Sequence, residues 1–210
     1  MERTYKYVGY FFLLLIPLIF AGFYKSYFQS FPFAKNIHVF EHLHAFIASV
    51  WVLILIVQPF LIFNNKTALH RKVGKLSYFV FPLLVLSFIP QIMKIVRTEN
   101  ISNLFFPLGD GTLLITFYSA AIYYRKNSSK HMRYMIALAL VLLGPTWGRI
   151  GGSLLGLSDL ATQNIQYAII YSILISLTLY DIRNKRKYFP YIIAMFGFMI
   201  HQAVYYWVFL

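Results

Sequence analysis

Residues 38–63 read HVFEHLHAFIASVWVLILIVQPFLIF, and no acidic residue, lysine or arginine follows Glu41 in this run. About 20 apolar residues in a helix span the ~30 Å hydrocarbon core of a bilayer, so the run is long enough to cross a membrane. Six further apolar runs approach this length, namely Tyr7–Tyr24, Leu76–Val96, Phe106–Tyr124, Met132–Gly156, Ile165–Tyr180 and Phe189–Phe209. We therefore expect an all-α membrane protein, a seven-transmembrane helix bundle in which residues 1–210 form a single domain.

The composition agrees with this fold class. Of the 210 residues, 60% are hydrophobic and only 12% are charged, which is typical of a polytopic membrane protein. The absence of cysteine excludes disulfides, thiol catalysis and iron–sulfur ligation. A net charge of +13 could indicate nucleic-acid binding, but the basic residues lie in short loops beside apolar runs. Membrane insertion explains that placement better, so the lipid bilayer is the expected partner and nucleic acid is not.

The distribution of charge predicts the orientation. If the N-terminus is cytoplasmic, fourteen of the 19 basic residues and two of the six acids, Glu2 and Asp181, fall on the cytoplasmic side. That side then carries a net charge of +12 against +1 on the other. Because cytoplasmic loops are enriched in Lys and Arg, we expect a cytoplasmic N-terminus and an external C-terminus in the bacterial cytoplasmic (inner) membrane.

Four ionisable residues stand inside the predicted spans: His42, His44, Arg149 and His201. Such residues cost about 2.5–3.5 kcal/mol at the bilayer centre, so they usually face the bundle interior or a wet cavity. His44 lies about 9 Å in from His38, and His201 lies about 12 Å below the outer surface. By the same count Gln91 and Arg149 have comparable depths, and Asp110 stands at the outer mouth of its helix. The sequence thus predicts a polar pocket, built on His44, Arg149 and His201, in the outer half of the bilayer.

One interpretation of this pocket is a metal centre. His38 and His42 have the i, i+4 spacing of metal ligands on a helix, and His201 would supply a third imidazole. With Glu41 as a general base, the pattern resembles the inverted zinc-protease motif H-x-x-E-H and would make the protein a membrane-embedded zinc hydrolase. The alternative is that these are interfacial histidines hydrogen-bonded to water and loop backbone.

A second interpretation is heme binding. His44 and His201 would be the axial ligands of a b-type heme, and Arg149 would contact its propionates. His70 and His131, at the cytoplasmic ends of their helices, could form a second bis-imidazole pair, although solvated histidines are expected in basic flanks. Heme b or a transition metal, with a possible redox role, is the favoured cofactor, whereas the substrate and any catalytic residues stay unknown.

A third interpretation is a small-anion or proton-coupled transporter, in which Glu41, His44, Arg149, Asp110 and His201 bind and release the solute or proton. Arg149 needs an acidic partner, for which Asp110, Glu41 and Asp159 are available. The helix around Pro145 would be its moving part, because it is kinked and carries Gly144, Gly148, Gly152 and Gly156. The glycine stripe also suits tight packing or a homo-oligomer, and a structural subunit remains a further alternative.

Three short motifs resemble those of a family of predicted bacterial membrane proteins known as a domain of unknown function. They are Gln58-Pro59, Leu69-His70-Arg71-Lys72-Val73-Gly74 and His131-Met132-Arg133-Tyr134-Met135. The resemblance covers roughly residues 42–149 and implies a multi-helix bundle with a histidine in the second helix and His-Arg loops. It implies no activity. From the residues themselves, Gln58 and Gln91 are expected to form hydrogen bonds between helices.

Overall fold

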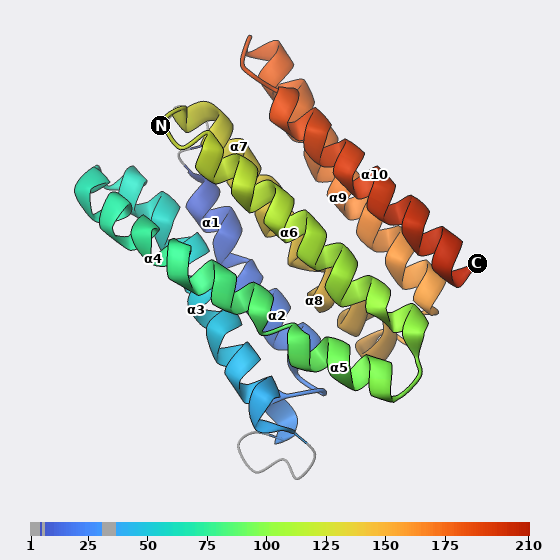
Figure 1. The fold of residues 1–210 in the computed structure, drawn as a ribbon. Coiled ribbons are helices and arrows are strands. Elements are labelled where there is room, and N and C mark those ends of the chain that lie inside the picture. The colour runs from blue at the N-terminus through green and yellow to red at the C-terminus, as the bar shows by residue number, and fades with distance from the viewer. Residues whose placement is uncertain (1–4, 6, 31–36) are drawn as a thin grey trace. The chain divides into compact units, whose positions relative to one another are not determined.

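The computed structural model describes residue 5 and residues 7–30 and 37–210, and these residues form helices and turns with no strand. Contacts divide the chain into two compact units, Met1–Glu99 and Asn100–Leu210. Figure 1 shows the longest helices of the second unit running side by side. Arg3, Lys6, Lys35 and Glu2, which enter the charge count, lie outside the described residues. A single domain over residues 1–210 stays a prediction.

The first unit is built on a helical hairpin. It contains α1 (Val8–Leu13), α2 (Leu15–Phe23), the short 3₁₀ turn η2 (Phe28–Ser30), α3 (Val39–Phe63), α4 (Thr67–Leu86) and α5 (Ile89–Arg97). The α3–α4 connection is three residues long and contains Asn65 at φ 58°. Trp51 is fully buried and packs on Phe81 with ring centroids 5.1 Å apart, which joins α3 to α4. α1 packs on the C-terminal end of α3, where Gly9 lies against the Phe60 ring.

The second unit contains η3 (Ile101–Leu104), α6 (Phe105–Tyr123), α7 (Ser128–Val141), α8 (Leu143–Arg149), the π turn η4 (Ile150–Leu154), α9 (Asp159–Arg183) and α10 (Phe189–Phe209). α6 packs along α7, and α10 lies against α9 while also contacting α6 and α7 (Figure 1). Asn127 and Ser158 begin α7 and α9 as N-caps, because each side chain accepts a hydrogen bond from a backbone N–H three residues on.

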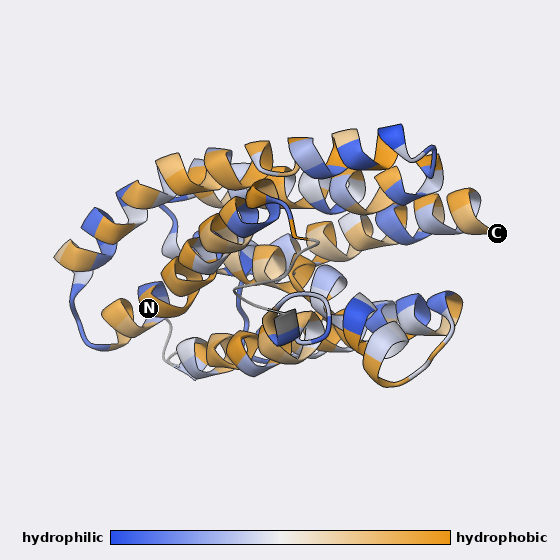
Figure 2. Cartoon of the chain, turned by 90° about the horizontal axis from the view of Figure 1, so that it is seen from below, coloured by the Kyte–Doolittle hydropathy of each residue, from blue (hydrophilic) through white to orange (hydrophobic). Residues whose placement is uncertain are grey.

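Six helical segments in the described part of the chain are long and apolar enough to cross a membrane: Val39–Phe63, Thr67–Arg97, Ile101–Tyr123, Ser128–Leu154, Asp159–Arg183 and Phe189–Phe209. Hydrophobic residues cover most of their length (Figure 2), and large apolar side chains such as Phe79, Phe196 and Trp207 are exposed. The expectation of an all-helical membrane protein is therefore supported. The first apolar run forms only Val8–Phe23, about 24 Å long against a ~30 Å core, so a seventh span is not established.

Prolines account for the breaks in these helices. α1, α4 and α7 end at Leu13, Leu86 and Val141, each four residues before a proline. Proline has no N–H to donate to the carbonyl four residues back, and its ring clashes with that carbonyl. The kink expected at Pro145 is present as the boundary between α7 and α8. Pro59 and Pro82 stand inside continuous helices.

Two predicted boundaries are wrong by several residues. The third predicted helix begins at Thr67 rather than Leu76, so the Leu69–Gly74 motif forms the first turns of α4 and is not a loop. α9 runs over Asp159–Arg183 rather than 165–180. The apolar run marks the part of a helix that suits the hydrocarbon core, whereas backbone hydrogen bonding continues through the polar residues at its ends.

Candidate functional site

The second unit brings together a buried imidazole, a buried phenol and a half-buried carboxylate. His201, thirteenth of the 21 residues of α10, is only 7% exposed. Its Nδ1 lies 2.9 Å from the Tyr167 hydroxyl on α9, and its Nε2 lies 3.5 Å from Oδ1 of Asp110 on α6. The Phe105 ring closes one side, with its centroid 4.5 Å from that of the imidazole. Three helices of the unit thus meet at this group of residues, which we call the His201 site.

Two glycines shape the His201 site. A Cβ added at Gly109 would lie 2.7 Å from Nε2 of His201, which is too close for any real contact, so only glycine lets the imidazole approach α6. A Cβ at Gly144 on α8 would lie 3.2 Å from both carboxylate oxygens of Asp110 and 3.4 Å from Nε2 of Gln166. The Asp110 carboxylate and Gln166 Nε2 therefore both lie close against Gly144, where a side chain would crowd them.

Hydrogen bonding within the His201 site is incomplete. His201 Nε2 and Gln166 Oε1 are buried and have no hydrogen-bond partner among the described residues. The separation of 3.5 Å between Nε2 and Asp110 is within ion-pair range but too long for a good hydrogen bond. Because buried polar atoms are nearly always satisfied, such a group calls for an explanation. A site that exchanges protons or holds a ligand provides one.

Arg149 ends α8 and belongs to the same unit. Its Nη1 donates to the Pro145 carbonyl at 2.6 Å, and the side chain is exposed. Among the three acids considered as its partner, Asp110 is close enough to act on the guanidinium electrostatically. Glu41 is engaged elsewhere, by Lys94 of α5 at 2.9 Å. The second unit thus brings Asp110 near both Arg149 and His201. His44 belongs to the first unit, so a pocket built on His44, Arg149 and His201 stays a prediction.

His38, Glu41 and His42 of the first unit have local partners. Glu41 accepts from the His38 backbone N–H at 3.3 Å and so caps α3, in addition to its ion pair with Lys94. His42 Nδ1 lies 2.7 Å from the Tyr27 hydroxyl. Burial raises the pKa of the Tyr27 phenol, which keeps the hydroxyl protonated. Gln91 is half-buried on α5.

His44 is fixed by the end of α4. Its Nδ1 lies 2.7 Å from Ser87 Oγ, and that hydroxyl donates its own proton to the Leu84 carbonyl at 2.6 Å. Ser87 must therefore accept from His44, which places the imidazole proton on Nδ1.

His70 and His131 are held in the same way. His70 Nδ1 donates to the Gln58 carbonyl at 3.4 Å, while Gln58 Nε2 donates to the His70 carbonyl at 3.2 Å. This double link joins α3 to α4, so Gln58 does bond between helices as expected. His131 Nδ1 donates to the Ala121 carbonyl at 2.8 Å. In each neutral imidazole, Nε2 then carries the lone pair.

The predicted metal sets do not assemble within either unit. Among the described residues, no three His, Asp or Glu side chains form a group that could hold a metal ion. His38, Glu41 and His42 belong to the first unit, whereas His201 belongs to the second. Whether the histidines bind a metal or heme stays a prediction.

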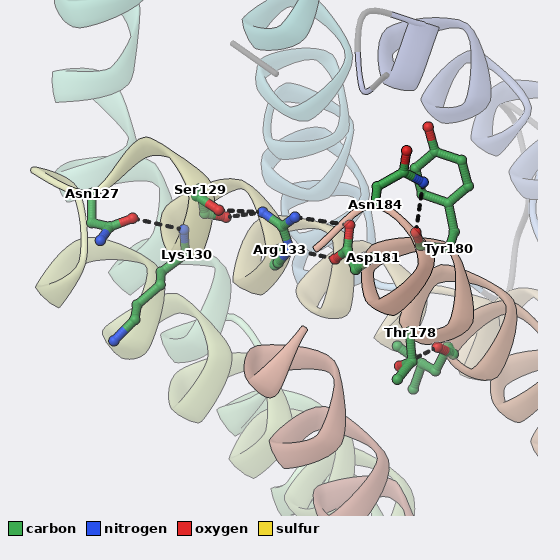
Figure 3. A network of polar contacts seen from close by, with 9 residues as sticks. Asn127, Ser129, Lys130, Arg133, Thr178, Tyr180, Asp181 and Asn184 are labelled. Carbon is green, nitrogen blue, oxygen red and sulfur yellow. Dashed lines mark hydrogen bonds and ion pairs between the residues drawn. The ribbon is translucent and has the colours of Figure 1, made fainter. Parts of the chain in front are cut away.

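Sequence reasoning missed a buried ion pair. Arg133 of α7 donates from Nε and Nη2 to the two carboxylate oxygens of Asp181 on α9, at 2.6 and 2.9 Å, and both side chains are fully buried. Arg133 Nη1 also donates to the carbonyl of Ser129 at 2.9 Å, as Figure 3 shows. Both residues entered the charge count as cytoplasmic flanks. The one signal was that Asp181 is a rare acid beside a strongly basic loop.

The glycines of the predicted stripe differ in what packs against them. Gly144 borders the His201 site, whereas a Cβ at Gly148 or Gly152 would meet no atom of the described residues within 4 Å. The close approach falls instead on Gly151, where a Cβ would lie 2.5 Å from Thr162 of α9. A homo-oligomer through the stripe stays a prediction.

No family model, curated protein or solved structure matches this chain. The resemblance seen in its short motifs is therefore neither supported nor opposed by these comparisons, and function rests on the geometry of the sites.

Proposed function

We propose that this protein is a proton-coupled membrane carrier, and that His201 and Asp110 are the groups that exchange the proton. The observation that carries the proposal is the pair formed by buried His201 and half-buried Asp110, on helices apolar and long enough to span a membrane. His201 Nε2, which faces the carboxylate, has no hydrogen bond among the described residues. Ionisable groups at such depth are costly and generally mark ion or proton pathways. Histidine is suited to this role because its unperturbed pKa of about 6.5 lies near physiological pH.

The pair has two chemically distinct forms. With a proton on both ring nitrogens, His201 donates to Tyr167 from Nδ1, and its positive charge faces Asp110 at Nε2. With one proton lost, the Tyr167 hydroxyl can donate to Nδ1 or accept from it, so the imidazole keeps a partner in either tautomer. Tyr167 thus positions the ring while Nε2 gains or loses its proton beside the carboxylate.

We also propose a membrane orientation and seven spanning helices for this protein. In a cytoplasmic-N arrangement, the loops rich in Lys and Arg face the cytoplasm and the His201 site lies in the outer half of the bacterial inner membrane. Val8–Phe23 is then a seventh span, short enough that the bilayer thins around it. Cysteines placed singly in the Lys185 and Glu99 loops test this, because only the latter should react with an external impermeant thiol reagent.

Charge displacement tests the proton exchange. Proteoliposomes adsorbed on a solid-supported membrane should give a transient current after a pH jump, and His201→Gln or Asp110→Asn should abolish it. Glu99→Gln removes an exposed acid and is the matched control that should leave the current intact. A current unchanged in His201→Gln would refute the proposal.

A second candidate, binding of heme or a transition metal, is favoured by a separate observation. His44, His70 and His131 each donate from Nδ1 to a fixed acceptor, which leaves Nε2 as the nitrogen able to ligate a metal. Metal-ligating histidines are commonly oriented in this way by a carbonyl or hydroxyl. A reduced-minus-oxidised absorption spectrum of protein expressed with ample heme tests it. Sharp bands lost in His44→Ala would support a cytochrome, and a flat spectrum would exclude heme.

The hydrolase interpretation gains no comparable support. Glu41, its proposed base, is held by Lys94 and by the His38 backbone, and the described residues bring no third ligand to His38 and His42.

A further inference from the structure

One face of α4 combines basic residues with a long apolar stripe, and we call it the α4 face. Lys72 and Lys75 lie on it near the start of the helix, and the stripe continues along the same side at helical spacing. The stripe consists of Leu76, Phe79, Leu83 and Leu86. Each of these four side chains is half exposed or more. The opposite side of the helix, where Phe81 meets Trp51, packs on α3.

The basic residues beside this stripe have no acidic counterpart. Residues 42–98 contain neither aspartate nor glutamate. Arg71, Lys72 and Lys75 are exposed and lie within about one turn of each other, and none forms an ion pair among the described residues. Lys94 of the same unit is instead paired with Glu41. The start of α4 therefore carries three uncompensated positive charges close together.

The first turns of α4 are fixed to α3. Gln58 and His70 exchange two hydrogen bonds between the helices, as described above, and His70 lies on the side of α4 away from the stripe. The backbone at Gly74 also lies near Gln58, because a Cβ added there would be 3.5 Å from its Nε2. The three basic residues thus stand on an anchored helix rather than on a loop, which lowers the entropic cost of binding a ligand.

The dimensions of the α4 face match one leaflet of a bilayer. The stripe from Leu76 to Leu86 rises about 15 Å, half of the ~30 Å hydrocarbon core. The basic turn before it then lies at the membrane surface, at the level of the phospholipid phosphates. Guanidinium and ammonium groups bind phosphate through charge-assisted hydrogen bonds. A phospholipid therefore fits both parts of this face, with its phosphate at the basic turn and an acyl chain along the stripe.

A second copy of this chain fits the α4 face less well. Two copies in one membrane have the same orientation, so a symmetric contact through this face would bring residues of equal depth together. Lys72 and Lys75 of one copy would then face those of the other, and like charges repel. A lipid with net negative charge instead neutralises them.

We infer that the α4 face binds an anionic phospholipid, whose phosphate is held by Arg71, Lys72 and Lys75. Zwitterionic phosphatidylcholine should bind more weakly, because its choline cation offsets the phosphate charge. The site lies wholly within the first unit. It is independent of proton exchange at His201 and of which side of the membrane is cytoplasmic.

A fluorescent label beside the α4 face tests the inference. The chain has no cysteine, so Tyr78→Cys provides a single thiol for a bimane label next to the stripe, with every residue of the stripe kept. The labelled full-length protein is reconstituted in phosphatidylcholine vesicles with increasing fractions of chain-brominated phosphatidylglycerol or chain-brominated phosphatidylcholine. Bromine quenches the bimane at short range, so the two titrations give the relative affinity of the two lipids. Phosphatidylglycerol should be preferred at least about fivefold, as one basic residue near an anionic lipid provides.

Two matched pairs of substitutions locate the binding. Lys72→Gln combined with Lys75→Gln should remove most of the preference for phosphatidylglycerol. Lys126→Gln combined with Lys187→Gln removes two exposed lysines of the second unit and should leave the preference unchanged. Size-exclusion profiles and circular dichroism confirm that each labelled protein is folded.

Four results would overturn the inference. Equal quenching by the two brominated lipids in the labelled parent protein would show no preference for negative charge. A preference that both pairs of substitutions reduce equally would reflect the overall charge of the protein and not the α4 face. Absence of quenching by either lipid would show that protein covers this face. Loss of the preference on addition of inorganic phosphate at constant ionic strength would show that the basic cluster takes a soluble anion in place of lipid.

Discussion

The second unit contains two pairs of ionisable side chains that differ in burial and in how completely they are hydrogen-bonded. Arg133 and Asp181 are joined by two short hydrogen bonds, and Ser129 takes a third guanidinium donor. His201 and Asp110 stand 3.5 Å apart, with polar atoms around them that the described residues do not satisfy. A complete network rigidifies a fold, whereas an incomplete one is costly to stability and is kept where chemistry needs it. We therefore regard the Arg133–Asp181 pair as a structural clamp and the His201 site as the candidate functional site.

The largest effect is expected at the clamp. Asp181→Asn removes one charge and leaves Arg133 buried without its counter-ion, which should lower the free energy of unfolding by about 3–5 kcal/mol. Reversible denaturation in mixed micelles measures this value. Asp159→Asn, an exposed acid in the first turn of the same helix, is the control and should cost no more than about 1 kcal/mol. Equal losses in the two variants would remove the distinction between the clamp and an ordinary helix charge.

A crowding substitution probes the His201 site next. Gly109→Ala forces a methyl group against His201 Nε2 and should cost about 1–3 kcal/mol of stability through displacement of the imidazole. It should also reduce the charge displaced by a pH jump, because His201 is pushed from Asp110. Full stability with a normal current would show that His201 is not held as tightly as the geometry indicates.

The hydroxyl of Tyr167 offers a smaller and more specific test. Tyr167→Phe keeps the buried ring but deletes the partner of His201 Nδ1, so stability should fall by about 0.5–1.5 kcal/mol. If Tyr167 positions a proton-exchanging imidazole, the midpoint pH of the displacement current should shift as well. A stability loss with an unmoved midpoint would assign Tyr167 to packing alone.

The smallest stability change should come from the residue with the largest functional role. Asp110→Asn is isosteric, and the carboxylate it replaces is only weakly bonded, so the free energy of unfolding should change by less than about 1 kcal/mol. The pH-jump current should nevertheless disappear. A loss of unfolding free energy as large as that of Asp181→Asn would show instead that Asp110, like Asp181, has a structural role.

Several parts of this fold follow from the sequence alone. Apolar runs located six helices that are long and apolar enough to span a membrane, and Pro145 located the break between α7 and α8, because both effects are local. Helix ends were placed less well: the residues from Thr67 to Lys75 are polar enough to resemble a loop, yet they form the start of α4.

The partners of the charged residues could not be predicted in the same way. Arg133 and Asp181 are 48 residues apart, and each looked like an ordinary cytoplasmic flank. Tyr167 resembled the many interfacial tyrosines of this chain. Counting residues from the predicted helix ends placed Asp110, Arg149 and His201 at similar depths in the membrane. The count could not show which faces of the helices meet, or that Gly109 and Gly144 allow the side chains to come close together.

The clamp also has a fixed polarity. Asp181 lies in the last turn of α9, where the helix dipole presents partial negative charge and disfavours an acid by about 0.3–1 kcal/mol. An inverted pair, with the acid at 133 and arginine at 181, would suit that dipole better. It would lose a contact, however, because Arg133 donates to the Ser129 carbonyl and a carboxylate at position 133 has no proton to donate. The main chain of α7 thus favours the cation at position 133 over the acid.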